Sequence, residues 1–224
     1  MSHALQGIPW NTKSACTDTK GHRSMVMTAQ GRLPRPTPQE DQPLPHSARE
    51  FFEALPPIPG FRAEIIDGKL LMGPVGSPEH SWSATLLSYA LLPTVLERNW
   101  RAHVGGVNVC IEGPRDSLVP DLVLAPADCP RWGALELFSS GLIMVTEVVS
   151  PGSARVDRDD KPRIYAGGSV PIMLLVDPIA TPPTVTVLSA PEDSTYQNRS
   201  QVQMGKPIYI PVPVDFELDT SIFL

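Results

Sequence analysis

The chain has 224 residues, of which 42% are hydrophobic and 19% are charged, which suits one ordinary globular domain and excludes a fully disordered or collagen-like protein. Its 26 Pro and 16 Gly make up 42 of the 224 residues, a larger share than the usual combined value of roughly 12%. This excess excludes long uninterrupted helices, coiled coils and helical solenoids. The formal net charge of -6 excludes a protein that coats nucleic acid with a uniformly basic surface, although a compact basic site is still allowed.

The first part of the chain differs in composition from the rest. Residues 1–45 have few large apolar side chains and contain closely spaced prolines, among them Pro34, Pro36 and Pro38. Such a segment buries too little apolar surface to offset its conformational entropy. We therefore expect residues 1–45 to be a disordered, Pro-rich N-terminal tail and residues 46–224 to form one folded domain.

Two helices are predicted in the first half of this domain. Residues 47–55 form a short helix that Ser47 can cap, with Glu50 at the third helical position as in a capping box. Residues 78–99 have apolar side chains at mostly helical spacing and form the predicted principal helix, with Pro93 as an expected kink.

Hairpins and short strands are predicted elsewhere. Asp67 and Gly68, typical residues of a tight turn, separate residues 61–66 from residues 69–72 and predict a hairpin. A short helix is predicted at residues 159–166. Further strands are predicted at residues 102–111, 119–124, 142–149, 172–176, 184–189, 194–202 and 208–212. This order predicts an α/β (α+β) fold with a mixed sheet, flanking helices, and hairpins at its N-terminal and C-terminal ends.

Two carboxylates interrupt apolar strands. Asp121 lies in segment 119–124 and Glu147 in segment 142–149, where an isolated ionised group costs several kcal/mol unless it is paired or hydrogen-bonded. Each carboxylate can lie at a strand end that reaches solvent, or the two can converge on neighbouring strands. Converging carboxylates bind Mg²⁺ or Mn²⁺ well, because a hard cation prefers oxygen ligands and keeps waters that it can activate.

A basic cluster follows the second carboxylate. Arg155, Arg158, Lys161 and Arg163 lie directly after the segment that carries Glu147. A cluster of this kind is commonly the solvated start of a helix. It can also place cations beside a phosphate, so the three arginines are candidates for phosphate binding.

The order and spacing of these residues resemble a known family, the Uma-two type putative restriction endonucleases. The similarity is carried by Pro120 and Asp121, the run from Glu147 to Pro151, Asp157, Lys161 and Tyr165, and upstream by Glu64 to Leu70 and Ser77 to His80. It covers residues 47 to 224. That family is assigned to the PD-(D/E)XK nuclease superfamily, so the resemblance implies a restriction-endonuclease-like mixed sheet flanked by helices.

The resemblance implies a role for each matched residue. Asp121 and Glu147 would hold the divalent metal, and Lys161 would supply the catalytic ammonium group. In the simplest pattern of the superfamily this lysine stands two residues after the second acid, where the present chain has Val149. The resemblance also implies accessory positions, for which a solvated or merely hydrogen-bonded side chain is the alternative: Glu64, His80 and Asp157.

The implied function is metal-dependent hydrolysis of phosphodiester bonds in nucleic acid, with DNA as the expected substrate. The alternative is a nuclease-fold module that binds nucleic acid or a protein without cleaving it. The acidic net charge favours this alternative, since duplex binding draws much of its affinity from neutralised phosphates. A homodimer that joins two copies of segment 155–163 would supply a positive cleft and favour the nuclease.

Cysteine usage and hydropathy indicate the compartment. Cys16, Cys110 and Cys129 are odd in number, widely spaced and without zinc-ligand partners at the usual spacing, as expected in a reducing compartment. No segment approaches the roughly 18 apolar residues of a membrane span, and the N-terminal segment lacks the apolar core of a signal peptide. We therefore expect a cytoplasmic protein that does not bind membranes.

Overall fold

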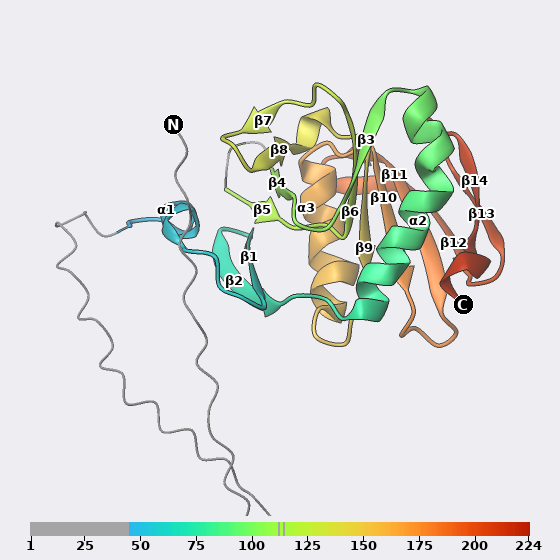
Figure 1. Ribbon diagram of the computed structural model, residues 1–224, viewed down its shortest axis with the longest axis horizontal. Coiled ribbons are helices and arrows are strands. Elements are labelled where there is room, and N and C mark those ends of the chain that lie inside the picture. The colour runs from blue at the N-terminus through green and yellow to red at the C-terminus, as the bar shows by residue number, and fades with distance from the viewer. Residues whose placement is uncertain (1–44, 112, 114) are drawn as a thin grey trace, which may run out of the picture. The chain divides into compact units, whose positions relative to one another are not determined.

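A computed structural model describes residues 45–111, 113 and 115–224, so the predicted tail lies outside the described residues apart from Pro45. In this part of the chain, two six-stranded sheets and one two-stranded sheet are accompanied by three α-helices (Figure 1). The helices are α1 (Ala48–Ala54), α2 (Pro78–Glu97) and α3 (Lys161–Gly167), the last preceded by a π-helical turn at Val156–Asp160. None of these described helices is both long and apolar enough to cross a membrane.

Apart from β11 and β12, the strands have two to six residues, as the many prolines and glycines predict. The first eight are β1 (Phe61–Ile66), β2 (Lys69–Pro74), β3 (Trp100–Val104), β4 (Asn108–Cys110), β5 (Ser117–Leu118), β6 (Leu122–Pro126), β7 (Arg131–Trp132) and β8 (Glu136–Phe138). They are followed by β9 (Met144–Val148), β10 (Ile172–Asp177), β11 (Thr184–Glu192), β12 (Thr195–Gln203), β13 (Pro207–Ile210) and β14 (Phe216–Asp219).

The central sheet has the strand order β12-β11-β10-β9-β6-β3. β9 and β10 are parallel and α3 lies in the connection between them, whereas the other neighbouring strands of this sheet are antiparallel. Alternate residues of β6 pack into different cores: Leu122 and Leu124 with α2, Val123 and Ala125 with α3. The sheet is therefore covered on both faces, which explains why its central strands are apolar on both sides.

The same alternation fixes the face on which Glu147 lies. In β9, Met144 and Val148 pack into the core beneath α2, whereas Val145 and the following Val149 pack into the core beneath α3. Because side chains alternate along a strand, Glu147 points toward α3.

The second sheet has the strand order β2-β1-β5-β4-β8-β7 and carries the N-terminal hairpin. β1 and β2 are joined by Asp67 and Gly68, whose φ angles of 51° and 70° give the left-handed turn that the sequence predicts. β1 is joined to β5 through one residue pair, Ile65 with Ser117. This long-range pair brings the hairpin beside the segment that leads into β6.

Most predicted elements are confirmed. The mixed sheet with flanking helices is present, and the hairpin predicted from segments 184–189 and 194–202 is formed by β11 with β12. Ser47 caps α1 by accepting the N–H of Glu50. The predicted helices at residues 78–99 and 159–166 correspond to α2, which contains Pro93, and to α3.

Two strand predictions are wrong in their extent. Segment 102–111 is divided between β3 in the central sheet and β4 in the second sheet, because Gly105 and Gly106 adopt φ angles of 62° and 68° and turn the chain. Segment 119–124 begins too early, since β6 starts at Leu122. β5, β7, β8 and β14 were not predicted, because strands of two to four residues carry too little periodicity.

Candidate active site

Asp121 is held immediately before β6 by hydrogen bonds from its backbone and its side chain. Its N–H donates to the carbonyl of Thr146 (3.0 Å), and its own carbonyl accepts the N–H of Gly105 (2.9 Å). Its Oδ2 accepts the N–H of Val148 (2.7 Å). The carboxylate is 8% exposed and fixed between β9 and the turn after β3.

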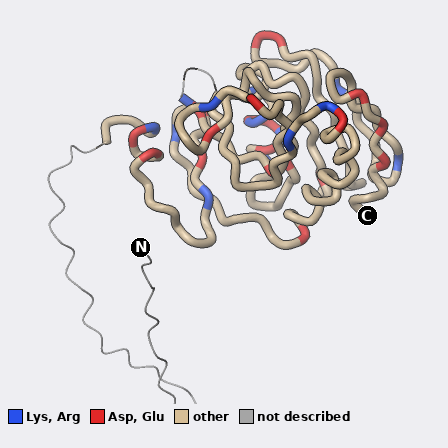
Figure 2. The backbone as a smooth tube through the Cα atoms, turned by 45° about the horizontal axis from the view of Figure 1, so that its top comes forward, with Lys and Arg blue, Asp and Glu red and all other residues tan. Residues whose placement is uncertain are grey.

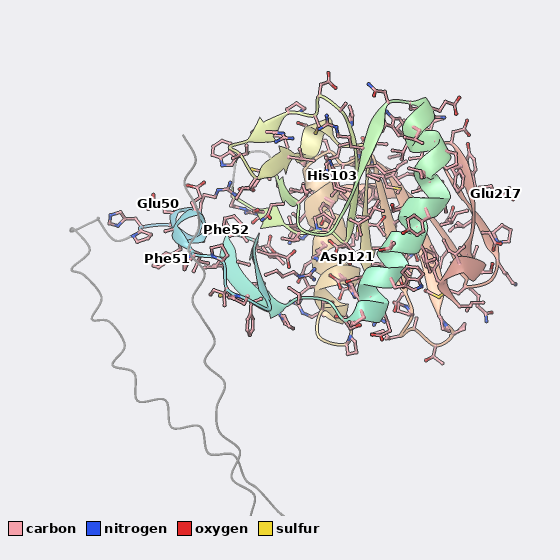
Figure 3. All side chains as sticks on the ribbon, viewed as in Figure 1. Glu50, Phe51, Phe52, His103, Asp121 and Glu217 are labelled. Carbon is pink, nitrogen blue, oxygen red and sulfur yellow. The ribbon has the colours of Figure 1, made fainter. Side chains whose placement is uncertain are left out.

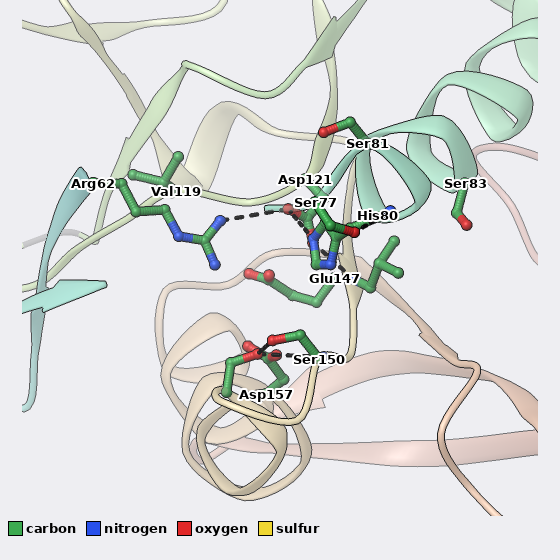
Figure 4. Close-up of polar contacts among 12 residues, drawn as sticks. Arg62, Ser77, His80, Ser81, Ser83, Val119, Asp121, Glu147, Ser150 and Asp157 are labelled. Atoms are coloured by element: carbon green, nitrogen blue, oxygen red, sulfur yellow. Dashed lines mark hydrogen bonds and ion pairs between the residues drawn. The ribbon is translucent and has the colours of Figure 1, made fainter. Parts of the chain in front are cut away.

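Two further side chains approach Asp121 from other elements, Arg62 from β1 and His80 from α2 (Figure 4). His80 Nε2 lies 2.8 Å and Arg62 Nη1 lies 3.4 Å from Oδ1 of Asp121. Burial raises the pKa of Asp121, but the hydrogen bond and charge of His80 and the N–H of Val148 outweigh it and lower the pKa below its usual value. Asp121 is therefore ionised at neutral pH.

The start of α2 places His80. Ser77 caps the helix, and its Oγ accepts the backbone N–H of His80 (3.3 Å). Gly76 lies against the imidazole, since a Cβ at that position would be 2.8 Å from Cδ2 of His80. Residue 76 must therefore lack a side chain for His80 to reach Asp121.

Glu147 is fully buried on the face of the sheet that α3 covers. Its Oε1 accepts the hydroxyl of Tyr165 (2.6 Å), and its Oε2 lies 2.8 Å from Nζ of Lys161. Burial raises the pKa of Glu147 to about 8; Lys161 opposes this shift, and the neighbouring carboxylates, Asp121 first, add to it. The ionised form of Glu147 is therefore costly without a further positive charge.

Lys161, the first residue of α3, is 1% exposed and lies among three carboxylates. Besides Glu147, it lies 3.1 Å from Oδ1 of Asp157 and 3.5 Å from Oε1 of Glu64. Burial lowers the pKa of Lys161, but these carboxylates outweigh burial and raise it well above its usual value. The contact of Lys161 with Glu147 is close but not oriented as a hydrogen bond, so both groups keep unused bonding capacity.

Glu64 connects the hairpin to this cluster. Its Oε1 accepts the N–H of Val119 (2.8 Å), and its Oε2 lies 3.9 Å from Nε of Arg62. β1 thus contributes two oppositely charged side chains, Arg62 toward Asp121 and Glu64 toward Lys161. The hairpin is part of the site.

The charges of this site do not balance. We use the name acidic cluster for the carboxylates of Asp121, Glu147, Glu64 and Asp157. Two permanent cations, Lys161 and Arg62, face these four carboxylates, so two negative charges are left uncompensated when all four, Glu147 included, are ionised. A divalent cation supplies the missing charge, and oxygen donors are the ligands that Mg²⁺ prefers.

The donor set fits a metal that is held partly by water or substrate. Among the described residues, no three side chains of His, Cys, Asp or Glu come together as a ready metal cage. Mg²⁺ is commonly bound by one or two carboxylates together with waters and substrate phosphates, so a complete protein cage is not required. Asp121 and Glu147 supply two such carboxylates. Arg62 of β1 contacts the first, and Lys161 of α3 contacts the second.

The three arginines considered for phosphate binding are not brought to the acidic cluster. Each has a carboxylate partner elsewhere: Arg155 with Asp160 at 2.9 Å, Arg158 with Asp177 at 2.7 Å, and Arg163 with Asp67 at 2.6 Å. Arg158 and Arg163 line a separate hollow of about 980 Å³ beside β11 and β12.

Sequence reasoning missed two residues of this site. Tyr165 was noted only as a match to the family pattern, although it stands four residues after Lys161 and therefore on the same helical face. Arg62 was not singled out. Its signal is weaker, because only strand alternation with Glu64 links it to the site.

Comparisons with known proteins are consistent with this geometry. A family model described as "Uma2: Putative restriction endonuclease" matches residues 49–221. Among solved structures, the chain is similar to a crystal structure of a putative nuclease belonging to DUF820 from Anabaena variabilis ATCC 29413. The two share 21% sequence identity with a TM-score of 0.61 over 80% of this chain and 97% of that chain, a likeness that establishes the fold alone.

No curated protein matches the chain. The family model nevertheless spans most of the sequence and includes every residue of the acidic cluster. The resemblance noted in the sequence is thereby confirmed, and the chain belongs to the Uma2 family of putative restriction endonucleases.

Proposed function

We propose that this protein is a divalent-metal-dependent endonuclease that hydrolyses phosphodiester bonds of DNA at the acidic cluster. The observation that carries the proposal is the meeting in one buried group of Asp121, which precedes β6, Glu147 of β9 and Lys161 of α3. Membership of a nuclease-type family and a nuclease-like fold support it.

Asp121 and Glu147 would hold the metal, either Mg²⁺ or Mn²⁺. When bound, such a cation lowers the pKa of a water molecule and neutralises charge on the phosphate. Val148 orients the Asp121 carboxylate by donating to Oδ2 while His80 contacts Oδ1, and Tyr165 orients Glu147 by donating to its Oε1. The two carboxylates are thus positioned before any ligand arrives, which lowers the cost of binding.

Lys161 acts as a fixed positive charge rather than as a base. The surrounding carboxylates raise its pKa, so it keeps its proton near neutral pH. Asp157 and Glu64, together with Glu147, hold the ammonium group in place. From there it would orient the attacking water and stabilise the phosphorane-like transition state.

The test is cleavage of supercoiled plasmid DNA with Mg²⁺ or Mn²⁺ by the full chain and by three variants, Asp121→Asn, Glu147→Gln and Lys161→Met. The matched control is Glu217→Gln, which removes an exposed carboxylate on β14 far from Asp121 (Figure 3). We expect each site variant to lose cleavage by about a hundredfold or more, and the control to cleave as wild type. Undiminished cleavage by Asp121→Asn would overturn the assignment.

A second candidate is a nuclease-fold module that does not cleave. One observation favours it: all four carboxylate oxygens of Asp121 and Glu147 already contact protein donors, namely Val148, His80, Arg62, Tyr165 and Lys161. Such a network can be purely structural. Thermal unfolding with millimolar Mg²⁺ separates the two candidates, because a metal site predicts a rise in Tm that Asp121→Asn abolishes, whereas a structural network predicts none.

A further inference from the structure

A cleft of about 800 Å³ reaches the acidic cluster at one of its residues, Asp121. At one end it is lined by Asp121, Arg62 and His80, and it continues between α1, β1 and the segment after β7. That second end is largely apolar, with walls that include Phe52, Phe61, Trp132 and Leu135. A ligand in this cleft therefore meets charge at one end and aromatic or aliphatic surface at the other.

The apolar walls are only partly covered by the protein itself. Phe61 is 53% exposed and Leu135 is 81% exposed. Exposed apolar surface that is grouped beside polar residues commonly marks a binding site, and a cleft of this volume lies in the range of small-molecule pockets. A flat aromatic group would cover this surface.

One aromatic wall is rigidly held. The guanidinium of Arg49 lies 5.4 Å from the centre of the Trp132 ring, and Phe138 contacts the same ring edge-on at 5.9 Å between centres. Arg49 is itself fixed by ion pairs with Glu53 and Glu136. Trp132 is thus positioned without a ligand, which reduces the entropy that binding would cost.

The charges that line the cleft do not suit a DNA duplex. Among its described lining residues, Arg62 and His80 are the basic ones, whereas Glu53, Asp121 and Glu136 are acidic. Figure 2 shows Lys and Arg interspersed with Asp and Glu along the described backbone rather than gathered in a stripe. Duplex binding depends on many neutralised phosphates, whereas single strands also gain affinity from stacking of bases on aromatic side chains.

We propose that this cleft binds an unstacked nucleobase next to the scissile phosphate, and that the preferred substrate is single-stranded DNA. Arg62, which carries a permanent charge and lines the cleft beside Asp121, contacts the phosphate, while the base lies against Phe61 and Trp132. This inference rests on the proposed nuclease function, since it assigns the substrate class of the same site. A nucleotide matches the cleft because it also has one charged end and one flat apolar end.

The test measures binding and cleavage separately. Binding to the full-length Glu147→Gln variant is followed by fluorescence anisotropy with a labelled single strand of about 12 nucleotides, the same sequence as a duplex, and an abasic strand of equal length. Cleavage of the same strands is measured with Mg²⁺ or Mn²⁺ and with protein that keeps Glu147. Phe61→Ala is compared with Tyr89→Ala, a control on α2 that removes an aromatic ring of similar exposure, 61%, outside the cleft.

We expect the single strand to bind about tenfold more tightly than the duplex, and Phe61→Ala to weaken single-strand binding about tenfold, the loss of one stacked base. Tyr89→Ala should bind the single strand as tightly as the parent chain does. Phe61→Ala should not weaken binding of the abasic strand, because that strand has no base to stack. Leu135→Ala, at a site too exposed to affect folding, should weaken single-strand binding in the same direction.

The results distinguish a failure of the single-strand inference from a failure of the proposed nuclease function. Equal or tighter binding of the duplex, or equal effects of Phe61→Ala and Tyr89→Ala, would overturn the single-strand inference while leaving any observed cleavage intact. Selective single-strand binding that Phe61→Ala weakens, without cleavage of any strand by the wild-type chain, would support the cleft and overturn the proposed nuclease function.

Discussion

Replacing Lys161 by Met is the sharpest test of the buried network. The substitution keeps an unbranched side chain of similar length but removes an ammonium group that is 1% exposed. Nζ of Lys161 lies 2.8 Å from Glu147, 3.1 Å from Asp157 and 3.5 Å from Glu64. Removing it leaves these three carboxylates, two of them buried, without the ammonium group, while Arg62 lies 3.9 Å from Glu64.

The expected cost is large. Breaking a buried ion pair by removing one partner costs about 3 to 5 kcal/mol, because the remaining charge keeps its desolvation penalty without compensation. For a domain of this size, each kcal/mol corresponds to roughly 2 to 4 °C in Tm. Lys161→Met should therefore lower Tm by about 6 to 20 °C in the absence of metal.

The cost should also depend on pH, with a sign that follows from Glu147. Its pKa is about 8 in the folded protein and 4.5 in the unfolded chain, so the stability linked to its proton is complete below 4.5 and is lost as the pH rises through about 8. Without Lys161, the pKa of Glu147 moves higher still, because the lysine opposes the shift. A proton then neutralises Glu147 over a wider pH range, and the deficit of Lys161→Met should be smaller near pH 5.5 than near pH 8.5.

The assay is urea denaturation followed by tryptophan fluorescence at both pH values, with chelator present. Lys206→Met, at an exposed lysine before β13, is the matched control and should unfold as wild type. If Lys161→Met lies within about 1 kcal/mol of wild type at both pH values, Lys161 does not compensate buried carboxylates and the reasoning fails.

Three further outcomes follow from single contacts. Gly76→Ala should displace the imidazole of His80, because the new Cβ would lie 2.8 Å from Cδ2, and should slow DNA cleavage about 10- to 100-fold at nearly unchanged Tm. Tyr165→Phe removes the donor to buried Oε1 of Glu147 and should cost about 1 to 3 kcal/mol in urea denaturation; an unchanged midpoint would show that this bond is not formed. Arg155→Ala should leave the cleavage rate within about twofold, since this arginine is 72% exposed and forms only a surface ion pair; a large loss of rate would restore it as a phosphate ligand.

The carboxylates of the site were predictable because their positions break a strong local pattern. A charged residue in a strand that is apolar on both faces must find a partner, and Asp121 and Glu147 both have one. What the strands alone left open was which face each carboxylate occupies. That depends on the packing of α2 and α3 on opposite sides of the sheet.

The contribution of Arg62 was not predictable from local sequence. On β1 it reads as one of several charged residues of a surface hairpin, and its contact with Asp121 depends on the pairing of β1 with β5. That pairing joins residues about fifty positions apart in the sequence, and no periodicity encodes it. The division of segment 102–111 between two sheets was unpredictable for the same reason. The turn at Gly105 is local, but the sheet that β4 joins after it is set by long-range pairing.

The position of Lys161 on α3, rather than on the strand that carries Glu147, has a structural reason. The position of the simplest superfamily motif, Val149, faces the same side of the sheet as Glu147 and is buried in the core beneath α3. Lys161 reaches that side from the helix, where Asp157 and Tyr165 stand one turn before and one turn after it. These three side chains, spaced four residues apart, form a polar stripe on a helix that covers a sheet, and such a stripe is stable only opposite a buried polar group. The polar residues of the helix and Glu147 of the strand are therefore best read together, because each supplies the partner that allows the other to be buried in the core.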